Sequence, residues 1–541
     1  MKIFNHKITS LILSFLFVLG LSACEDFLEE ENRTALSLET ASENPETFDQ
    51  LVASVYERAR ETTTKYTADM YYTLEDLGTD LVTRGTVVSG VDPINDYVNM
   101  NSTIWVFDVY WDNQYSVISA ANVVLDNAEA IQGVDEETKT TGMAEAKFFR
   151  AWSYFNLVEN YGGVPLVLYQ VTTAETDFFR ASEEEVYAQI ITDLEDALQG
   201  VSENPEAYGR VSKDAVRHLM SKVLLTRGYK SFGTSEDFTE AAALAATIIS
   251  KYPLVSSFEE LVDVGNQRNP EVVFAYLFGG DVVSRGWGNS RHMMYKFRYF
   301  DYPGMTRGNQ YQKGLGPAPT PFFFKLFEEG DERADATYRR VIYAEIDSED
   351  GSILAGDTAI YFPKTAWSQE AIDAVPYAVI NPGTYFTNNG VTDVHYPMFR
   401  KFDNPGVPFT QPDQQSEGTR DMVMMRAGEA YLIAAEANLQ LGNVAEAADL
   451  LTTLRARAGL TTPITESEVD LDFILDERAR ELMGEVNRWM DLKRTGQLVE
   501  RTLEYNPHAA LNNDLTVKNL LRPIPQSEID ISGFTQNPDY N

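Results

Sequence analysis

Segments with the apolar spacing of α-helices recur in adjacent pairs along this chain, and this repetition restricts its fold more than any other feature. A clear pair spans about 111–131 and 144–161, with apolar side chains three and four residues apart. Gly162, followed closely by Pro165, ends the second of these helices. Helices of this kind bury their apolar stripes against one another. We therefore predict an all-α scaffold.

Further segments repeat the pattern on both sides of the middle of the chain. Ser182 to Glu185 reads as a capping box at the start of a helix. Helical spacing then returns at about 213–229, 238–251, 426–441 and 445–457. Pairs of about 34 residues with Ala at helix crossings and short Gly turns resemble tetratricopeptide units, about four of them here. An irregular helical bundle would use similar stripes and stays open as an alternative.

The middle of the chain, 262–422, differs from the rest because it is rich in Gly, Pro, Asn and Tyr. Its Pro317 and Pro319 cannot lie inside a helix, and 295–299 alternates as a strand does. We predict a compact insert of loops and short strands that faces a ligand. The expected organisation is a leader at 1–23, a tether at 24–46, helical repeats at 47–261, the insert at 262–422, and helical repeats at 423–541.

The N-terminus has the pattern of a secretory signal peptide. Lys2 and Lys7 precede an apolar run at 8–20, which is short for a spanning helix. The run ends in Leu-Ser-Ala-Cys at 21–24, which resembles the lipobox of bacterial lipoproteins. That resemblance implies a diacylglycerol on the Cys24 sulfur, acylation such as palmitate on its amine, and attachment to a membrane. The alternative is an ordinary signal peptide with an incidental cysteine.

Composition excludes several classes of function. Cys24 is the only cysteine, so disulfides and cysteine-ligated metal centres are not expected. The net charge of −38 opposes binding to nucleic acid and to anionic headgroups. The histidines are isolated and no phosphate-binding loop occurs, so we predict no metal, no cofactor and no catalytic residues.

Ten short motifs occur in a fixed order behind the leader. They are AEAKFFRA at 144–151, YGGVP at 161–165, NPEVVF at 269–274, DER at 331–333, RAGEAYL at 426–432, LRARAG at 454–459, DERAREL at 476–482, RWMDLKR at 488–494, PIP at 523–525 and QNP at 536–538. Together they resemble the SusD/RagB family of outer-membrane nutrient-binding lipoproteins. The resemblance implies a non-catalytic lid subunit of a SusC-type TonB-dependent transporter, anchored in the outer membrane, facing the cell exterior and holding glycans or peptides.

The charged residues of these motifs favour structure over chemistry. Glu477, Glu481, Arg478 and Asp491 lie in helical segments, where they are more plausible as buried ion pairs between helices than as catalytic groups.

Ligand contacts are expected among aromatics outside the helical stripes, because a pyranose ring offers an apolar face and a rim of hydroxyls. Two regions fit. The loop from Arg84 to Trp105 carries Asn95, Asp96 and Tyr97, and the insert carries Trp287, Tyr295, Tyr299 and Trp367. For any single one of these aromatics, packing within the loop is the alternative role.

The leading hypothesis for function is a surface binder that delivers oligosaccharides to a partner transporter. A peptide-binding lid of the RagB kind is a close variant. A surface glycosidase and a purely structural helical scaffold are the rivals from other classes.

Overall fold

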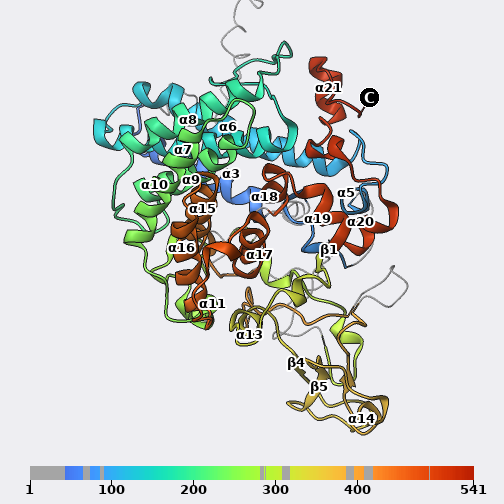
Figure 1. Ribbon diagram of the computed structural model, residues 1–541. Helices are drawn as coiled ribbons and strands as arrows, with labels where there is room; N and C mark the ends of the chain where they lie inside the picture. Colours follow the sequence, from blue (N-terminus) through green and yellow to red (C-terminus); the bar gives the residue numbers. More distant parts are fainter. Residues whose placement is uncertain are drawn as a thin grey trace, which may run out of the picture.

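The computed structural model describes residues 43–64, 74–85, 91–280, 286, 288–306, 317–385, 395–406, 418–485 and 488–540. Figure 1 shows a helical body with a smaller loop-rich part projecting from it. The predicted leader, the Cys24 lipidation site and the tether as far as residue 42 lie outside the described residues. In the part described, no helix has the length and apolarity to cross a membrane.

The N-terminal helices form a continuous array in chain order. They are α3 (Glu46–Thr64), α6 (Trp105–Asn127), α7 (Glu136–Tyr161), α8 (Glu183–Gly200), α9 (Lys213–Gly228) and α10 (Ser235–Lys251). Each of α3, α6, α7, α8, α9 and α10 packs on the next. Large apolar side chains such as Phe148, Leu194 and Leu224 are fully buried between them. This is the packing that an apolar stripe on each helix demands.

The array continues in the C-terminal part of the chain. Its helices are α15 (Ala427–Gln440), α16 (Val444–Arg457), α17 (Leu471–Leu482), α18 (Arg488–Arg494), α19 (Leu498–Tyr505), α20 (Pro507–Asn512) and α21 (Gln526–Ser532). Helix α15 packs on α10, α16 and α17. Helices on either side of the insert are therefore direct neighbours, and the predicted all-α scaffold of tetratricopeptide-like helix pairs is confirmed.

The helix ends follow local chemistry. Ser182 and Glu185 form the predicted capping box at the start of α8. Gly162 ends α7 with a φ of 71°, a conformation open to glycine. Helices α6 and α7 begin earlier than predicted, at Trp105 and Glu136. Asp135 explains the second case because its side chain caps the Thr138 N–H at 2.9 Å.

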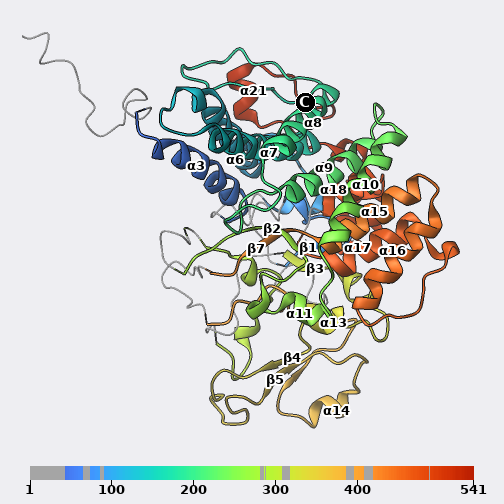
Figure 2. The same cartoon turned by 90° about the vertical axis from the view of Figure 1, so that its left-hand side faces the viewer.

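The insert is carried on a two-stranded ribbon. Strand β2 (Val272–Tyr276) pairs antiparallel with β7 (Met422–Arg426), so the chain leaves and re-enters the helical body at one place (Figure 2). Helix α11 (Phe258–Val262) lies just before the ribbon. Between β2 and β7 lie α13 (Arg333–Thr337), α14 (Gln369–Asp373), and the strands β4 (Val341–Tyr343), β5 (Thr358–Tyr361) and β6 (Ala378–Val379), which form one small sheet. A separate apolar cluster that includes Phe297, Tyr299 and Phe362 fills this part.

The prediction that 295–299 forms a strand is wrong. The structure has 3₁₀ turns at Arg291–Met293 and Tyr299–Asp301 with irregular chain between them. Tyr295 has a φ of 55°, which no strand residue adopts. Lys296 is buried like its aromatic neighbours, so the alternation in the sequence does not correspond to two faces of a strand.

Candidate functional site

Strand β1 (Val82–Arg84) is the element at which the two predicted ligand-facing regions meet. It pairs antiparallel with β3 (Pro317–Pro319) of the insert, with Thr83 opposite Ala318. Prolines fit here because an edge strand does not need every N–H. The Thr83 hydroxyl also donates to Asn506 Oδ1 at 3.0 Å. Segments far apart in the sequence are thus fixed at one edge of the helical body.

The loop after β1 is held by charges and by one buried tyrosine. Arg84 forms an ion pair with Asp96 at 3.2 Å, and Asp96 lies on α5 (Asp92–Asp96). Asn95 is fully buried and donates to Asp96 Oδ1 at 2.7 Å. Tyr97 is 2% exposed and its hydroxyl donates to the Gly78 carbonyl at 2.6 Å. Of the three predicted contacts in this loop, only Asp96 retains partial exposure.

The predicted ligand contacts in the insert that the structure describes are also buried or half-buried. Tyr295 is fully buried, packs on Phe399 with ring centroids 4.6 Å apart, and donates to Asp76 Oδ2 at 3.1 Å. Tyr299 lies in the apolar cluster of the insert. Trp367 is half-buried beside Tyr361, with ring centroids 5.3 Å apart. Trp287 lies outside the described residues.

Most of the predicted ligand contacts are buried. Asn95, Tyr97, Tyr295 and Tyr299 are enclosed by the chain itself, because each supports the loop on which it lies. A ring without exposed surface cannot stack on a sugar unless the loop moves. The structure brings Asn95, Asp96 and Tyr97 together and separates Trp367 from them. A role for any of these residues in ligand binding stays a prediction.

The backbone of this region is strained in a way typical of binding sites. Tyr97, Asn99 and Tyr295 have φ values of 59°, 56° and 55°. Non-glycine residues in this left-handed region cost of order 1–3 kcal/mol each and occur at ligand clamps and active sites. Burial also raises the pKa of Asp76, which accepts from Tyr295, to about 6.

Trp105 is an exposed aromatic at the end of this loop, where the neighbouring Ser102 contacts Gln526 of α21, and the sequence interpretation named it only as the end of the loop. It opens α6 and is 43% exposed, and it follows the exposed Asn99 and Asn101. The available signal was its spacing, because Asp108 follows three residues later and places Trp105 on the polar side of the helix. An exposed flat ring is one of the two things that a sugar requires, the other being polar groups for its hydroxyls.

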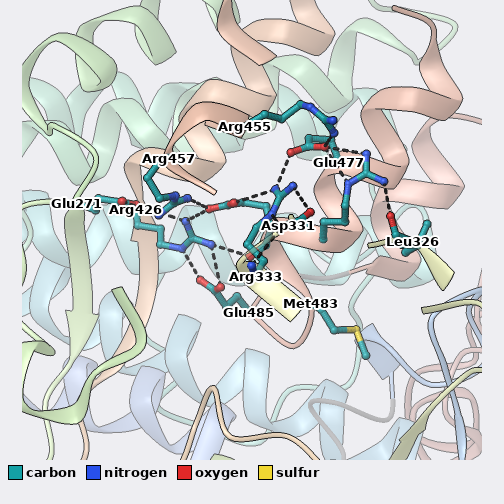
Figure 3. A network of polar contacts seen from close by, with 12 residues as sticks. Glu271, Leu326, Asp331, Arg333, Arg426, Arg455, Arg457, Glu477, Met483 and Glu485 are labelled. Atoms are coloured by element: carbon teal, nitrogen blue, oxygen red, sulfur yellow. Dashed lines mark hydrogen bonds and ion pairs between the residues drawn. The ribbon is translucent and has the colours of Figure 1, made fainter. Parts of the chain in front are cut away.

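The motif charges form a buried network where the insert joins the helical body. Figure 3 shows Arg333 directed at Glu477 and Asp331, while Arg426 is directed at Glu485. The Arg333–Glu477 distance is 2.6 Å, and both side chains are fully buried. Arg457 reaches Glu271, next to the β2–β7 ribbon, at 2.8 Å.

The predicted ion pairs between helices are confirmed. Arg478 and Asp491 lie 2.8 Å apart, and both side chains are buried. Despite burial, the guanidinium groups of Arg333, Arg480 and Arg455 hold the pKa of Glu477 down, to about 2. The guanidinium of Arg426 and the ammonium of Lys401 do the same for Glu485, also to about 2. Carboxylates kept ionised and enclosed in this way stabilise the fold and are not poised as general acids.

No group of three or more His, Cys, Asp or Glu side chains in the described ranges is arranged to hold a metal ion.

The fold defines a helical-repeat protein that carries a loop-rich insert on one ribbon. Residues 270–540 match the model of the SusD family, and residues 26–225 match a family described as starch-binding associating with outer membrane. The chain belongs to the SusD family. That description also associates the chain with the outer membrane.

Similar proteins and solved structures are consistent with this assignment to the SusD family. The chain is 24% identical to SusD-like protein P25 of Formosa agariphila over 97% of each chain, and 26% identical to SusD-like protein P2 of the same organism over 80% of each. A structure named laminarin binding SusD-like protein superposes with a TM-score of 0.66 and 24% identity, covering 92% of this chain and 100% of that one. Surface glycan-binding protein A from Bacteroides thetaiotaomicron, solved with laminarihexaose, gives a TM-score of 0.69 at 18% identity over 91% and 99%.

Proposed function

We propose that this protein is a surface lipoprotein that binds oligosaccharides and delivers them, as a lid subunit, to a SusC-type TonB-dependent transporter. The observation that carries the proposal is the family match over both halves of the chain. Two neighbours in fold are named for a laminarin ligand or were solved with a laminarin oligosaccharide, and they support a glycan as the ligand class.

The ligand-facing edge supports binding by stacking together with hydroxyl recognition. Trp105 offers an exposed ring, and Asn99 adds an exposed amide on the same loop, whereas the Asn101 amide is engaged with the Asn99 carbonyl and with Thr103. Arg84 and Asp96, both half-buried, fix the loop from below. A lipid anchor at Cys24 and the transporter would keep this edge close to the pore, which raises the effective concentration of captured glycan.

The proposal includes the absence of catalysis. Retaining and inverting glycosidases need two carboxyl groups about 5–10 Å apart that face the substrate. The motif acids Glu477, Glu481 and Asp491 are instead buried in ion pairs with arginines. Release of products from a bound glycan would contradict this part of the proposal.

The first experiment is titration calorimetry of the polypeptide from residue 25 onward, which holds every residue that the structure describes. Neutral oligosaccharides, acidic oligosaccharides and mixed peptides are titrated in turn, and each mixture is then examined by chromatography for cleavage products. Saturable heat with a neutral glycan and no products supports the proposal. Heat with peptides alone indicates the RagB-type alternative.

Trp105→Ala tests the location of the site. We expect glycan affinity to fall by about tenfold or more, equivalent to about 1.4 kcal/mol, with a smaller change in melting temperature than a buried tryptophan would give, because Trp105 is 43% exposed. Phe179→Ala is the matched control, since Phe179 is 83% exposed and lies on a different segment. Equal affinity of the two variants would place the site elsewhere.

The lipid anchor has its own test. Expressed with its leader, the protein should partition into detergent and carry the mass of acyl chains on Cys24. Cys24→Ala should abolish both properties. A water-soluble, unmodified mature protein would contradict the anchor and leave the binding proposal standing.

A further inference from the structure

A cavity of about 370 Å³ lies between α6, the segment 165–178 and α21. It is at the opposite end of the molecule from the insert, and Figure 2 shows α21 lying against the α6 region there. Its volume is within the range of small-molecule sites. Its apolar wall includes Trp111, Tyr115, Phe178 and Phe534, and its acids are Asp112 and Glu528. We call it the α6–α21 cavity.

The walls of this cavity are fixed by hydrogen bonds. Tyr115 donates from its hydroxyl to the Pro165 carbonyl at 2.8 Å. Asn122 donates to the carbonyls of Val167 and Tyr169 at 2.9 and 3.0 Å. These contacts hold the segment 165–178 over one face of α6, so the opening is part of the folded structure.

The carboxylates of Asp112 and Glu528 in the cavity, and that of Asp108 near it, lie close enough to repel one another. Asp108 and Asp112, four residues apart on α6, share a face of that helix. Burial raises the pKa of Glu528, and the charges of Asp112 and Asp108 raise it further, against a hydrogen bond from the Trp111 indole. Burial and then Asp108 raise the pKa of Asp112.

No cation of the described chain pairs with these three carboxylates. Arg180 is the nearby guanidinium, and it donates to the Gly163 and Tyr161 carbonyls at 2.7 and 3.0 Å and to Asn537 Oδ1 at 2.7 Å. Its charge is therefore held by other oxygens. A negative cluster beside an aromatic wall attracts a positive group through both Coulomb and cation–π interactions.

We propose that the α6–α21 cavity binds a primary alkylammonium group on an apolar chain, with the lysine side chain of a peptide as its source. The apolar wall fits methylenes, and Asp112 and Glu528 fit the ammonium group. The hydrogen-bonding groups of Tyr115 and Asn122 are engaged with the segment 165–178, which leaves few to satisfy the hydroxyl rim of a sugar. This proposal does not rest on glycan binding, although the N-terminus of α6, which carries Trp105, also contacts α21 through Asp108 and Ser527.

The test titrates the polypeptide from residue 25 onward with n-pentylammonium, with its neutral counterpart 1-pentanol, and with Nα-acetyl-lysine-methylamide. The signals are heat and the change in intrinsic tryptophan fluorescence, to which Trp111 in the cavity wall contributes. The double variant Asp112→Asn, Glu528→Gln keeps the shape of the cavity and removes two charges. Glu500→Gln, an exposed carboxylate on α19, is the matched control.

We expect pentylammonium to bind at least about tenfold more tightly than 1-pentanol and to lose that advantage in the double variant alone. The double variant should also melt at a slightly higher temperature, because like charges no longer repel. Equal binding of amine and alcohol, or no binding of either, overturns the proposal. Binding of pentylammonium without binding of the lysine derivative overturns the lysine source.

Discussion

Tyr97 and Gly78 show how single residues shape the ligand-facing edge. The hydroxyl of Tyr97 bonds to the Gly78 carbonyl, and the ring lies against the glycine. A Cβ at Gly78 would lie 2.7 Å from the Ile94 carbonyl oxygen, and Gly78 has a φ of 74°. Both residues are therefore committed to holding the loop in place.

Gly78→Ala should destabilise the protein and disturb glycan binding together. The left-handed backbone costs about 1 kcal/mol, and the clash with backbone adds a further 1–3 kcal/mol. Gly496→Ala is the matched control because Gly496 has a φ of 73° with open space around it, so only the backbone cost applies. Denaturant unfolding of both variants measures the difference. Equal losses would show that the contact with Ile94 is unimportant.

The residue scale also shows where sequence reasoning stopped. That Tyr97 and Tyr295 are aromatic, outside helices and next to polar residues was readable from the sequence. Their hydroxyls reach Gly78 and Asp76, contacts that depend on tertiary structure. Aromatic loop residues that bind a ligand and those that hold the loop have the same composition, so position in the chain does not separate them.

At the scale of elements, the buried network attaches the insert to the helices. Arg333 of α13 reaches Glu477 and Glu481 of α17, while Arg426 at the end of β7 reaches Glu481 and Glu485. Removal of one member leaves uncompensated charge in the interior, which is more costly than the pair itself is stabilising.

Arg333→Met should lower the free energy of unfolding by about 3–5 kcal/mol, because Asp331 and Glu477 lose their buried partner. The control is Arg58→Met on α3, whose own side chain is 50% exposed and whose loss should cost about 1 kcal/mol or less. Chemical denaturation measures both. A small effect at Arg333 would mean that water reaches the network.

The helices themselves were predictable for a local reason. Stripes three and four residues apart and caps such as Ser182 with Glu185 act within a few residues, so the sequence carries them directly. Arg478 and Asp491 were predicted as partners and are 13 residues apart. Arg333 and Glu477, 144 residues apart, were not paired in advance because nothing local links them.

For the whole molecule, the buried carboxylates set the response to acid. The folded pKa of Glu477 and of Glu485 is about 2, against an ordinary value of 4.5. A depressed pKa gives stability that is fully present above pH 4.5 and is lost as pH falls toward 2. Asp76 acts in the opposite direction, since its raised pKa of about 6 favours folding by on the order of 3 kcal/mol as pH falls from 6 toward 3.8, which offsets the loss from one glutamate.

We therefore expect the melting temperature to change little from pH 7 to 5 and to fall steeply below pH 4.5. Each of the two glutamates contributes on the order of 3 kcal/mol at neutral pH. Calorimetric scans between pH 3 and 8 measure the profile. A melting temperature that stays level down to pH 3 would contradict the ionised network.

The β2–β7 ribbon brings the two ends of the insert side by side where they join the helical body. A segment whose two ends lie side by side can be exchanged for another while the stacking of α10 on α15 stays as it is, provided that the replacement keeps Arg333, with its neighbour Asp331, as the partner of Glu477 and Glu481. For engineering, the ribbon marks Tyr276 and Met422 as the natural splice points for grafting a cassette from one relative into another.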